Sequence, residues 1–329
     1  MSDKLILVAG GGGFIGGHLI AKLLELGHTR IRCVDIKPTS EWYQVHDGVE
    51  NVVADLKLKE ACVAACQDAD RVYNLAADMG GMGFIENNKA LCMLSVLINT
   101  HLLEAAKDAG VDRFFYASSA CVYNADKQKC EDVVPLKEAD AYPAMPEDGY
   151  GWEKLFSERM CRHFREDYGL TTRVARFHNV YGPYGTWDGG REKAPAAICR
   201  KVIHAKETGD HNIEVWGDGK QTRSFMYIDD CVEGILKITE SDILEPINLG
   251  SDEIVTITGL TEMVAEIAGI EITRDHNLDA PKGVNGRNSD NTLIQELLGW
   301  APGIKLRDGM EKTYNWIHAE YLAKHGATV

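Results

Sequence analysis

Tyr150 and Lys154 have the residue types and the spacing for acid–base chemistry. They lie four residues apart, so a helix would carry both on one face. A phenol with a reference pKa of about 10 is a poor base at neutral pH. An adjacent ammonium group favours phenolate and lowers that pKa, so Tyr150 could exchange a proton with a substrate hydroxyl.

Cys121 and Lys193 form a second candidate pair. A thiol with a reference pKa near 8.5 is partly ionised at neutral pH and can exchange a carbon-bound proton beside a ketone. Lys193 precedes Pro195, which suggests the first turn of a helix, and the helix dipole with Arg191 would lower the pKa of the lysine. Two other readings stay open: Cys121 as a small buried filler and Lys193 as a solvated lysine at a helix start.

Strand and helix patterns place these groups near one another. The apolar run 114–117 predicts a buried strand that delivers Ser118 and Ser119 to the carboxyl edge of a sheet, where ligands bind in such folds. Residues 150–168 follow a helical pattern. We therefore expect the two serines, Cys121 and the Tyr150 helix to meet at one sheet edge.

The N-terminal residues predict a dinucleotide site. An apolar strand at 5–9 leads into a glycine-rich turn at 10–16 and a helix from His18 to Leu26, an order that places a pyrophosphate on the helix N-terminus. Asp35 ends the next strand, where a carboxylate would bind the ribose hydroxyls of NAD and repel the 2′-phosphate of NADP. A surface turn is the alternative for Asp35. The expected cofactor contacts are Gly10, Gly13, Phe14, Ile15, Gly16, Asp35, Asp55, Leu75, Ala76, Tyr150 and Lys154.

Composition limits the class of protein. The chain has 329 residues and a formal net charge of -15, which argues against nucleic acid as a partner. No run approaches the roughly 20 apolar residues of a membrane span, and Met1 to Lys4 lead straight into a strand, so we expect no membrane and no signal peptide. Nine cysteines without paired spacing fit the reduced thiols of a cytoplasmic protein. His18, His101 and His178 lack metal-ligand spacing, so no metal is assigned.

The order of the elements predicts the fold class. Strands alternate with helices, which indicates an α/β protein with a Rossmann-type, doubly wound parallel sheet. We expect residues 1–174 plus about 221–252 to form this NAD-binding domain. About 175–220 plus 253–329 should form a smaller C-terminal substrate-binding lobe.

Motifs along almost the whole chain carry a family resemblance. They are the turn at 10–16, Asp35, residues 74–77, Asn99, Ser118 and Ser119, Tyr150 with Lys154, Arg176 with residues 179–183, and residues 298–302. With these motifs the chain resembles the extended short-chain dehydrogenase/reductase family. The resemblance implies NAD-linked oxidation and re-reduction of a sugar hydroxyl, with the positive nicotinamide ring further lowering the pKa of Tyr150.

More specific segments are similar to one group in that family, the GDP-mannose 3,5-epimerases. These segments are 78–84, 119–121, 176–179, 185–187, 189–197, 216–219 and 286–290. The resemblance implies an isomerase that converts GDP-D-mannose to GDP-L-galactose, with GDP-L-gulose as a side product. It implies transient C4 oxidation and proton exchange at C3 and C5, with Tyr150, Lys154, Cys121, Lys193 and Ser119 as catalytic residues.

The same resemblance implies a substrate site and an assembly. A homodimer would form through helices near 89–109 and 150–168, while Trp216 and Tyr227 are expected in the core. Arg223 and Arg287 could neutralise a diphosphate. The expected substrate contacts are Gly80, Gly81, Met82, Gly83, Ser118, Ser119, Ala120, Asn179, Glu192, Lys193, Lys201, Gln221, Arg287 and Ser289.

Departures and alternatives remain at this stage. Ala9, Trp152 and Asn124 stand where the family usually has a threonine, an aliphatic residue and a proline, and Asn124 lies close enough to the site to bear on the product ratio. The alternative functions are an NAD-dependent nucleotide-sugar 4-epimerase or 4,6-dehydratase, and a non-catalytic NAD-sensing protein.

Overall fold

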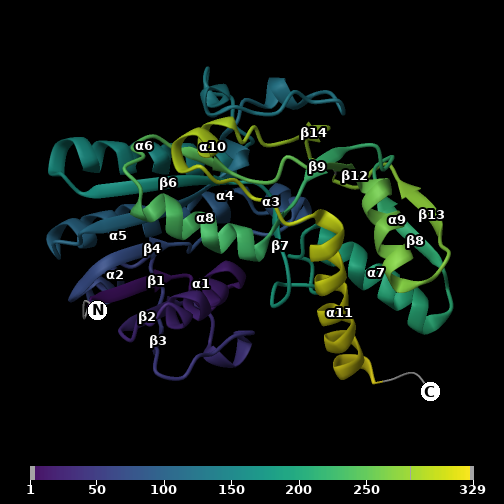
Figure 1. Ribbon diagram of the computed structural model, residues 1–329, viewed down its shortest axis with the longest axis horizontal. Helices are drawn as coiled ribbons and strands as arrows, with labels where there is room; N and C mark the ends of the chain where they lie inside the picture. The colour runs from purple at the N-terminus through teal and green to yellow at the C-terminus, as the bar shows by residue number, and fades with distance from the viewer. Residues whose placement is uncertain (1–3, 282, 327–329) are drawn as a thin grey trace.

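A seven-stranded parallel sheet forms the centre of the molecule (Figure 1). The computed structural model describes residues 4–281 and 283–326; residues 1–3, part of the segment in which we expect no signal peptide, lie outside them. The predicted fold class is confirmed. In sheet order the strands are β11 (Ile247–Leu249), β6 (Thr171–Phe177), β5 (Arg113–Ser119), β4 (Ala69–Asn74), β1 (Leu5–Ala9), β2 (Ile31–Asp35) and β3 (Glu50–Val53).

Helices cover both faces of this sheet, which is why its central strands are apolar throughout. All five residues of β1 are buried, and alternate residues face two different hydrophobic clusters. One cluster packs under α1 (Phe14–Glu25) and α8 (Ile228–Glu240). The other packs under α2 (Lys59–Cys66), α5 (Ser95–Asp108) and α6 (Tyr150–Tyr168).

The strand order reverses between β1 and β4. The chain builds β2 and β3 on one side of β1, and β4, β5, β6 and β11 on the other. In open parallel sheets, ligands bind at the carboxyl ends of the strands at such a switch point. The glycine turn after β1 and residues 75–85 after β4 both lie there.

Smaller sheets and helices form a second region, on the right of Figure 1. Its helices α7, α9 and α11 pack against one another. The predicted domain boundaries stay a prediction; β6 continues past residue 174, and β11 joins the large sheet. The elements are β7 (Val180–Tyr181), α7 (Ala194–Thr208), β8 (Asn212–Trp216), β9 (Thr222–Ser224), β10 (Met226–Tyr227), β12 (Ile254–Thr256), α9 (Ile257–Ala268), β13 (Thr273–Asn277), β14 (Gly286–Arg287) and α11 (Leu306–His325). The helix α10 (Thr292–Leu298) packs instead against β11 of the large sheet.

Two predicted helix boundaries need correction, while the helix at 150–168 is confirmed as α6. The helix predicted from His18 begins at Phe14, because the tight turn is complete at Gly13. The helix expected near 89–109 is divided at Leu94 into α4 (Lys89–Met93) and α5. Two short helical segments in this half of the chain, α3 (Met82–Asn87) and the 3-10 turn η2 (Ala120–Val122), border the site.

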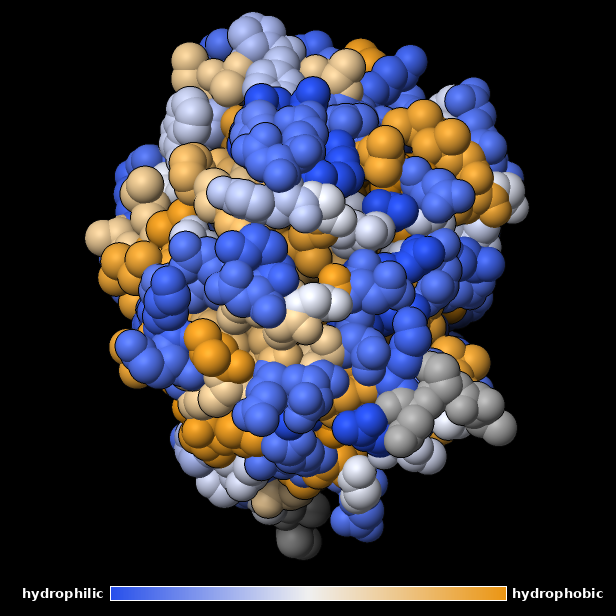
Figure 2. Space-filling view, turned by 90° about the vertical axis from the view of Figure 1, so that its left-hand side faces the viewer, coloured by the Kyte–Doolittle hydropathy of each residue, from blue (hydrophilic) through white to orange (hydrophobic). Residues whose placement is uncertain are grey.

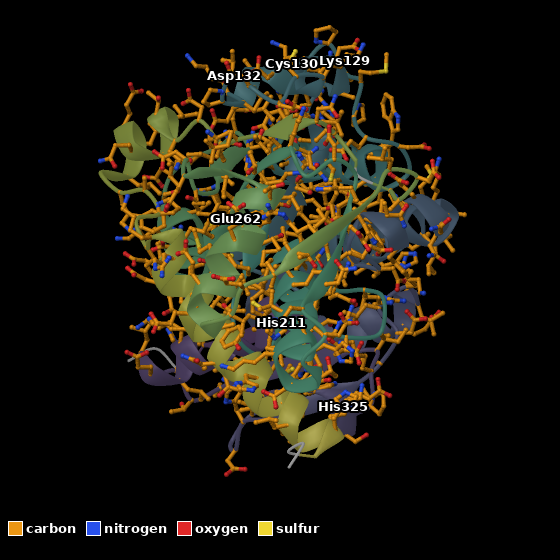
Figure 3. All side chains as sticks on the ribbon, turned by 90° about the vertical axis from the view of Figure 1, so that its right-hand side faces the viewer. Lys129, Cys130, Asp132, His211, Glu262 and His325 are labelled. Atoms are coloured by element: carbon orange, nitrogen blue, oxygen red, sulfur yellow. The ribbon has the colours of Figure 1, made fainter. Side chains whose placement is uncertain are left out.

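On the side shown in Figure 2, hydrophobic residues lie in small groups between polar ones. The segment Lys89–Asp108 is long and apolar enough to cross a membrane by length and composition alone, and 44% of its most apolar 18-residue window is buried inside the protein. A core helix of a soluble protein passes the same test. Figure 3 views the molecule from the side of the second region, with Lys129, Cys130 and Asp132 on a surface loop at the top and His211 below.

Candidate active site

The glycine turn forms a cradle whose shape only glycine allows at two positions. Gly10 has φ +80°, and a Cβ there would lie 2.9 Å from the Ala76 backbone. A Cβ on Gly16 would lie 2.3 Å from the Gly10 carbonyl oxygen. Among the described residues no side chain caps α1, so its first N–H groups point at an open turn. This arrangement suits a pyrophosphate.

Acidic side chains border the cradle. The Gly10 N–H donates to the Val34 carbonyl at 2.7 Å, which holds the turn beside Asp35. Asp35 is buried, and its Oδ1 accepts from the Lys37 N–H at 3.0 Å. Asp55 accepts in the same way from the Lys57 N–H at 2.9 Å. The residues present therefore fit the pyrophosphate and ribose of a dinucleotide such as NAD.

The remaining predicted cofactor residues surround the same turn. The Leu75 N–H donates to the Ala9 carbonyl at 3.0 Å, which draws the segment after β4 against β1. Phe14 stacks edge-on against His18, with ring centroids 5.6 Å apart, and also borders Gly185. Ile15 packs against the core under α1.

Tyr150 and Lys154 share the buried start of α6, as predicted. The Lys154 Nζ donates to the Ala117 carbonyl at 3.1 Å and lies 5.5 Å from the centroid of the Tyr150 ring. Burial raises the pKa of Tyr150 well above 10, nearby Cys121 and Glu153 raise it further, and a hydrogen bond with Ser119 opposes the change. The predicted lowering by the ammonium group is thus wrong for the protein chain by itself, because the cost of burying a phenolate is larger.

Cys121 lies directly beside Tyr150. Together with Cys92 they form a small buried cluster, against which Met79, Phe84 and Ile85 pack. The close approach depends on Gly151, because a Cβ there would lie 2.4 Å from the Cys121 carbonyl oxygen. Sequence analysis missed Gly151, although a glycine in the first turn of a helix is a signal of close packing.

Arg287 contacts the sulfur of Cys121. Its NH1 donates to Sγ at 3.7 Å, and its Nε donates to the Gln128 Oε1 at 2.7 Å. It also pairs with Glu147, whose backbone N–H donates to the Cys121 carbonyl at 3.0 Å. Gln128 and Glu147 belong to no motif, so only the fold shows that they hold this arginine against the thiol.

Lys193 is the N-cap residue of α7, where the proline in the first turn predicted a helix start. Burial lowers the pKa of Lys193, while Cys121 and Cys231 act in the opposite direction. The predicted direction is confirmed, but its main cause is burial rather than the helix dipole or Arg191. Cys121 therefore lies near enough to interact with the Lys193 ammonium, although the two residues come from different regions of the fold.

The glycine-rich segment after β4 packs against the segment that precedes α7. A Cβ on Gly81 would lie 2.5 Å from the Glu192 carbonyl oxygen, and one on Gly83 would lie 3.5 Å from the Trp216 ring. A Cβ on Gly80 would lie 2.9 Å from the Cβ of Phe84, and Met82 begins α3. The predicted substrate residues Gly80, Gly81, Met82 and Gly83 thus lie in a segment that packs directly against Glu192 and Lys193.

Three predicted substrate residues lie in the second region with part of their hydrogen bonding satisfied. Lys201 Nζ donates to the Glu214 carbonyl at 2.7 Å, and burial lowers its pKa. Gln221 Nε2 donates to the Trp216 carbonyl at 2.8 Å, and its buried Oε1 has no hydrogen-bond partner among the described residues. Asn179 donates to the Ser224 carbonyl at 3.2 Å.

Some predicted contacts have other partners in the structure. The Ser118 hydroxyl donates to Glu158 at 2.6 Å, and the Ser289 hydroxyl donates to Asn291 at 2.8 Å, so each could meet a substrate only as a hydrogen-bond acceptor. The Glu192 carboxylate accepts from Arg200 at 2.9 Å. Ala120 is buried, and the Ser119 Oγ accepts from the Cys121 N–H at 3.2 Å.

Two core predictions have different outcomes. Tyr227 is buried, as predicted, whereas Trp216 is 42% exposed. Trp216 ends β8, in which buried and exposed residues alternate, so it falls on the exposed face with Glu214. Across residues 4–281 and 283–326, no group of three or more His, Cys, Asp and Glu side chains is placed to hold a metal ion.

The comparisons with known proteins agree with this geometry. The family model described as the NAD dependent epimerase/dehydratase family matches residues 6–250. GDP-mannose 3,5-epimerase 1 of Oryza sativa subsp. indica is 49% identical over 324 residues, covering 96% of this chain and 82% of the relative. GDP-mannose 3,5-epimerase of Arabidopsis thaliana is 47% identical over 319 residues, covering 95% and 81%.

Among solved structures, the UDP-glucose 4-epimerase of Thermotoga maritima, determined with UDP-glucose, has the same fold. It superposes with a TM-score of 0.86 at 24% identity, over 96% of this chain and 99% of that one. With the phosphate cradle, the Tyr150–Lys154 pair and these matches in place, the chain belongs to the NAD dependent epimerase/dehydratase family.

Proposed function

We propose that this protein is an isomerase that converts GDP-D-mannose to GDP-L-galactose, with GDP-L-gulose as a side product. The observation that carries the proposal is the convergence of Cys121, Tyr150 and Lys193 at one site. A phenol serves the hydride step, and two further proton carriers serve inversion of neighbouring carbons. The relatives that are 47–49% identical carry the same activity in their names.

The chemistry follows from these three groups. NAD, when bound at the glycine cradle, supplies reversible hydride transfer at C4 of the hexose. Tyr150 removes the proton of the C4 hydroxyl as the hydride leaves C4, so C4 becomes a ketone. Tyr150 returns the proton when the hydride comes back. The ketone acidifies the hydrogens on C3 and C5. Cys121 and Lys193 then remove and replace those protons from different sides of the ring.

Cationic side chains provide the site for the anionic nucleotide. Arg223 is partly buried, and burial lowers its pKa to about 10, so it stays protonated at neutral pH. It donates to the Val284 carbonyl at 2.5 Å, close to Arg287 on β14. Lys201 lies near the exposed ring of Trp216, with its Nζ 5.8 Å from the ring centroid. Although Arg287 pairs with Glu147 and Lys201 with Glu214, these three side chains bring cationic donors to one region of a chain of net charge -15.

Turnover in heavy water tests the proposed reaction. The purified protein is incubated with GDP-mannose and NAD in D2O, and the recovered nucleotide sugars are analysed by NMR. We expect deuterium at both C3 and C5 and the formation of GDP-L-galactose. Turnover without deuterium at either carbon would identify a 4-epimerase, and loss of water with no 3,5-inversion would identify a 4,6-dehydratase. No turnover at all would identify a non-catalytic protein.

Replacing Cys121 with Ala tests the role of the thiol. We expect proton exchange to fall by about 10²-fold or more, the usual contribution of a positioned acid or base, while NAD binding is retained. Cys130→Ala is the matched control, because Cys130 is exposed on the surface loop labelled in Figure 3. Exchange at the native rate in Cys121→Ala would remove the thiol from the mechanism.

We also propose that the protein forms a homodimer through α4, α5 and α6. Met93, Leu97, Trp152 and Phe156 are all more than one-third exposed on these helices, although all four are apolar. A second copy of the same helices would cover them. Phe156→Glu should halve the mass measured by light scattering, whereas Val134→Glu, at another exposed apolar side chain, should leave it unchanged. A wild-type mass of one chain would contradict this proposal.

A cytoplasmic location is a further proposal. All nine cysteines are free thiols in the structure, as expected in a reducing compartment. Cell fractionation with an antibody against the native chain tests it, and recovery with a secreted or membrane fraction would contradict it.

A further inference from the structure

Two segments from different regions of the fold are joined backbone to backbone beside the site. The first, residues 78–84, follows β4, and the second, residues 188–193, precedes α7. The Gly81 N–H donates to the Arg191 carbonyl at 3.1 Å. A Cβ on Gly81 would lie 2.5 Å from the Glu192 carbonyl oxygen and 3.8 Å from the Lys193 Cα. The first segment therefore fixes the backbone position of Lys193.

The side chain of Arg191 extends this contact. Its guanidinium carbon lies 4.0 Å from the centroid of the Phe84 ring, and its NH1 lies 3.9 Å from Asp78 Oδ1. Asp78 is held in turn, because its backbone N–H donates to the Ser95 hydroxyl at 3.0 Å. Its other carboxylate oxygen lies 3.6 Å from the Nζ of Lys57. Arg191 thus reaches from the segment before α7 onto an anchored carboxylate and an aromatic ring.

Phe84 connects Arg191 to the reacting groups. The ring packs against the buried cluster of Cys92, Cys121 and Tyr150. A cation placed over this ring holds the segment before α7 against the same cluster. Arg191 therefore links the region that carries Lys193 to the region that carries Cys121.

Glu192, which lies between Arg191 and Lys193 in the chain, is anchored to α7. Glu192 accepts from the Arg200 NH2 at 2.9 Å and from the Gly190 N–H at 2.7 Å. Arg200 also donates to the Trp187 carbonyl at 3.2 Å. Neighbouring residues are therefore held to opposite elements, Arg191 to the segment after β4 and Glu192 to α7.

We propose that Arg191 is a positioning residue for the epimerisation: it latches the segment before α7 onto Asp78 and Phe84 and so sets Lys193 against Cys121. The inference rests on the proposed function for its kinetic test. In this proposal Arg191 binds Asp78 and Phe84 of the protein itself and does not bind the diphosphate of the nucleotide. The contacts of Arg191 should affect the proton exchanges at C3 and C5. They should not affect hydride transfer at C4.

Kinetics of Arg191 variants test this role. In Arg191→Ala we expect kcat for C3 and C5 exchange to fall at least tenfold with KM for GDP-mannose within twofold, while NADH still forms transiently. Arg191→Lys keeps a cation for Asp78 and Phe84 and should recover part of the loss. The double variant Arg191→Ala/Asp78→Asn should be little worse than Arg191→Ala alone, because both substitutions remove the same Arg191–Asp78 contact. Arg307→Ala is the matched control, since Arg307 is an exposed arginine paired with Glu266 at 2.7 Å.

Results that would contradict the role of Arg191 can be told apart from results that would contradict the proposed function. A rise in KM with unchanged kcat would make Arg191 a substrate contact, and native kinetics in Arg191→Ala would exclude the latch. If the wild type fails to turn over GDP-mannose, the proposed function fails and the latch is judged by hydrogen exchange. Amide exchange of the Gly81 segment should quicken in Arg191→Ala and not in Arg307→Ala. Unchanged exchange at Gly81 would overturn the latch independently of substrate.

Discussion

At the scale of single residues, burial acts on the two ionisable groups of the site in opposite directions but favours the neutral form of both. It raises the pKa of Tyr150 and lowers the pKa of Lys193, because desolvation disfavours phenolate and ammonium alike. The Lys193 ammonium therefore releases its proton more readily than that of an exposed lysine. A cation beside the Tyr150 ring would favour phenolate and oppose the effect of burial.

Replacing Lys193 with Arg tests whether this lysine exchanges protons. Arginine keeps the positive charge but stays protonated at any working pH. We therefore expect deuterium incorporation at C3 and C5 to fall by about 10² to 10⁴-fold, with transient NADH formation retained. Deuterium NMR and absorbance at 340 nm measure the two steps separately. Lys129→Arg on the exposed loop is the control, and equal exchange in both variants would show that Lys193 only supplies charge.

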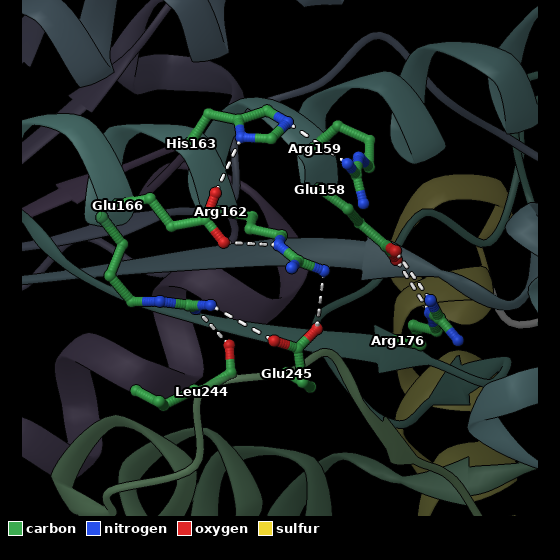
Figure 4. Close-up of polar contacts among 9 residues, drawn as sticks. Glu158, Arg159, Arg162, His163, Glu166, Arg176, Leu244 and Glu245 are labelled. Atoms are coloured by element: carbon green, nitrogen blue, oxygen red, sulfur yellow. Dashed lines mark hydrogen bonds and ion pairs between the residues drawn. The ribbon is translucent and has the colours of Figure 1, made fainter.

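At the scale of elements, a buried ion pair ties α6 to the sheet behind the site. Arg176 on β6 donates through Nε and NH2 to the two carboxylate oxygens of Glu158, at 2.9 and 2.8 Å, and both side chains are 3% exposed (Figure 4). Ser118 donates to the same carboxylate. This network sets the position of the helix that begins at Tyr150.

Removing one partner of that pair should destabilise the whole protein. Arg176→Met leaves the Glu158 charge buried without its cation, which costs about 3–5 kcal/mol of unfolding free energy. Arg162→Ala breaks an exposed pair on the same helix with Glu166, also drawn in Figure 4, and should cost about 0.5 kcal/mol or less. Urea unfolding followed by circular dichroism measures both. Equal losses in the two variants would refute the structural role of the buried pair.

The contact between α6 and η2 gives a second element-scale prediction. Gly151→Ala places a Cβ 2.4 Å from the Cys121 carbonyl oxygen, so the helix start must move away from the thiol. We expect about 1–3 kcal/mol of destabilisation together with a fall in C3 and C5 exchange. Gly303→Ala, where a Cβ would meet nothing within 4 Å, is the matched control. Native exchange in Gly151→Ala would show that the separation of Cys121 and Tyr150 is not critical.

Local patterns predicted the elements well, because the signals for them are local. Apolar runs gave β1 and β2, and Pro195 gave the start of α7. The glycine turn gave the presence of α1 but not its first residue, which is Phe14 rather than His18. The exposed position of Trp216 was also within reach, since residues 212–216 alternate in polarity as an edge strand does.

Hydrogen bonds and ion pairs between residues far apart in the chain could not be predicted from the sequence. Ser118 shares its face of β5 with Phe114 and Tyr116, so its hydroxyl meets Glu158 under α6, a fact that requires the register of the strand and the helix. The contacts of Gln128 and Glu147 with Arg287 join segments far apart in the chain. Long-range polar contacts of this kind leave no periodic signal.

At the scale of the whole molecule, the free energy of unfolding depends on groups buried away from the chemistry. His178 follows β6 and is fully buried, with its N–H bonded to the Leu249 carbonyl of β11 and its Nε2 3.0 Å from Asn248 Oδ1. Burial lowers the pKa of His178 to about 4, a hydrogen bond with Asn248 raises it, and Arg176 lowers it. This histidine thus stays neutral where β6 meets the edge strand β11.

The sign of the resulting pH dependence follows from proton binding. An unfolded histidine binds a proton below pH 6.5, whereas folded His178 binds one only near pH 4, so stability is complete above 6.5 and falls as the pH drops through this window. The shift corresponds to about 3 kcal/mol. Urea unfolding at pH 7.5 and 4.5 should show this loss in the wild type and in His211→Gln, an exposed control, but a smaller one in His178→Gln. An identical loss in His178→Gln would assign the acid sensitivity to other groups.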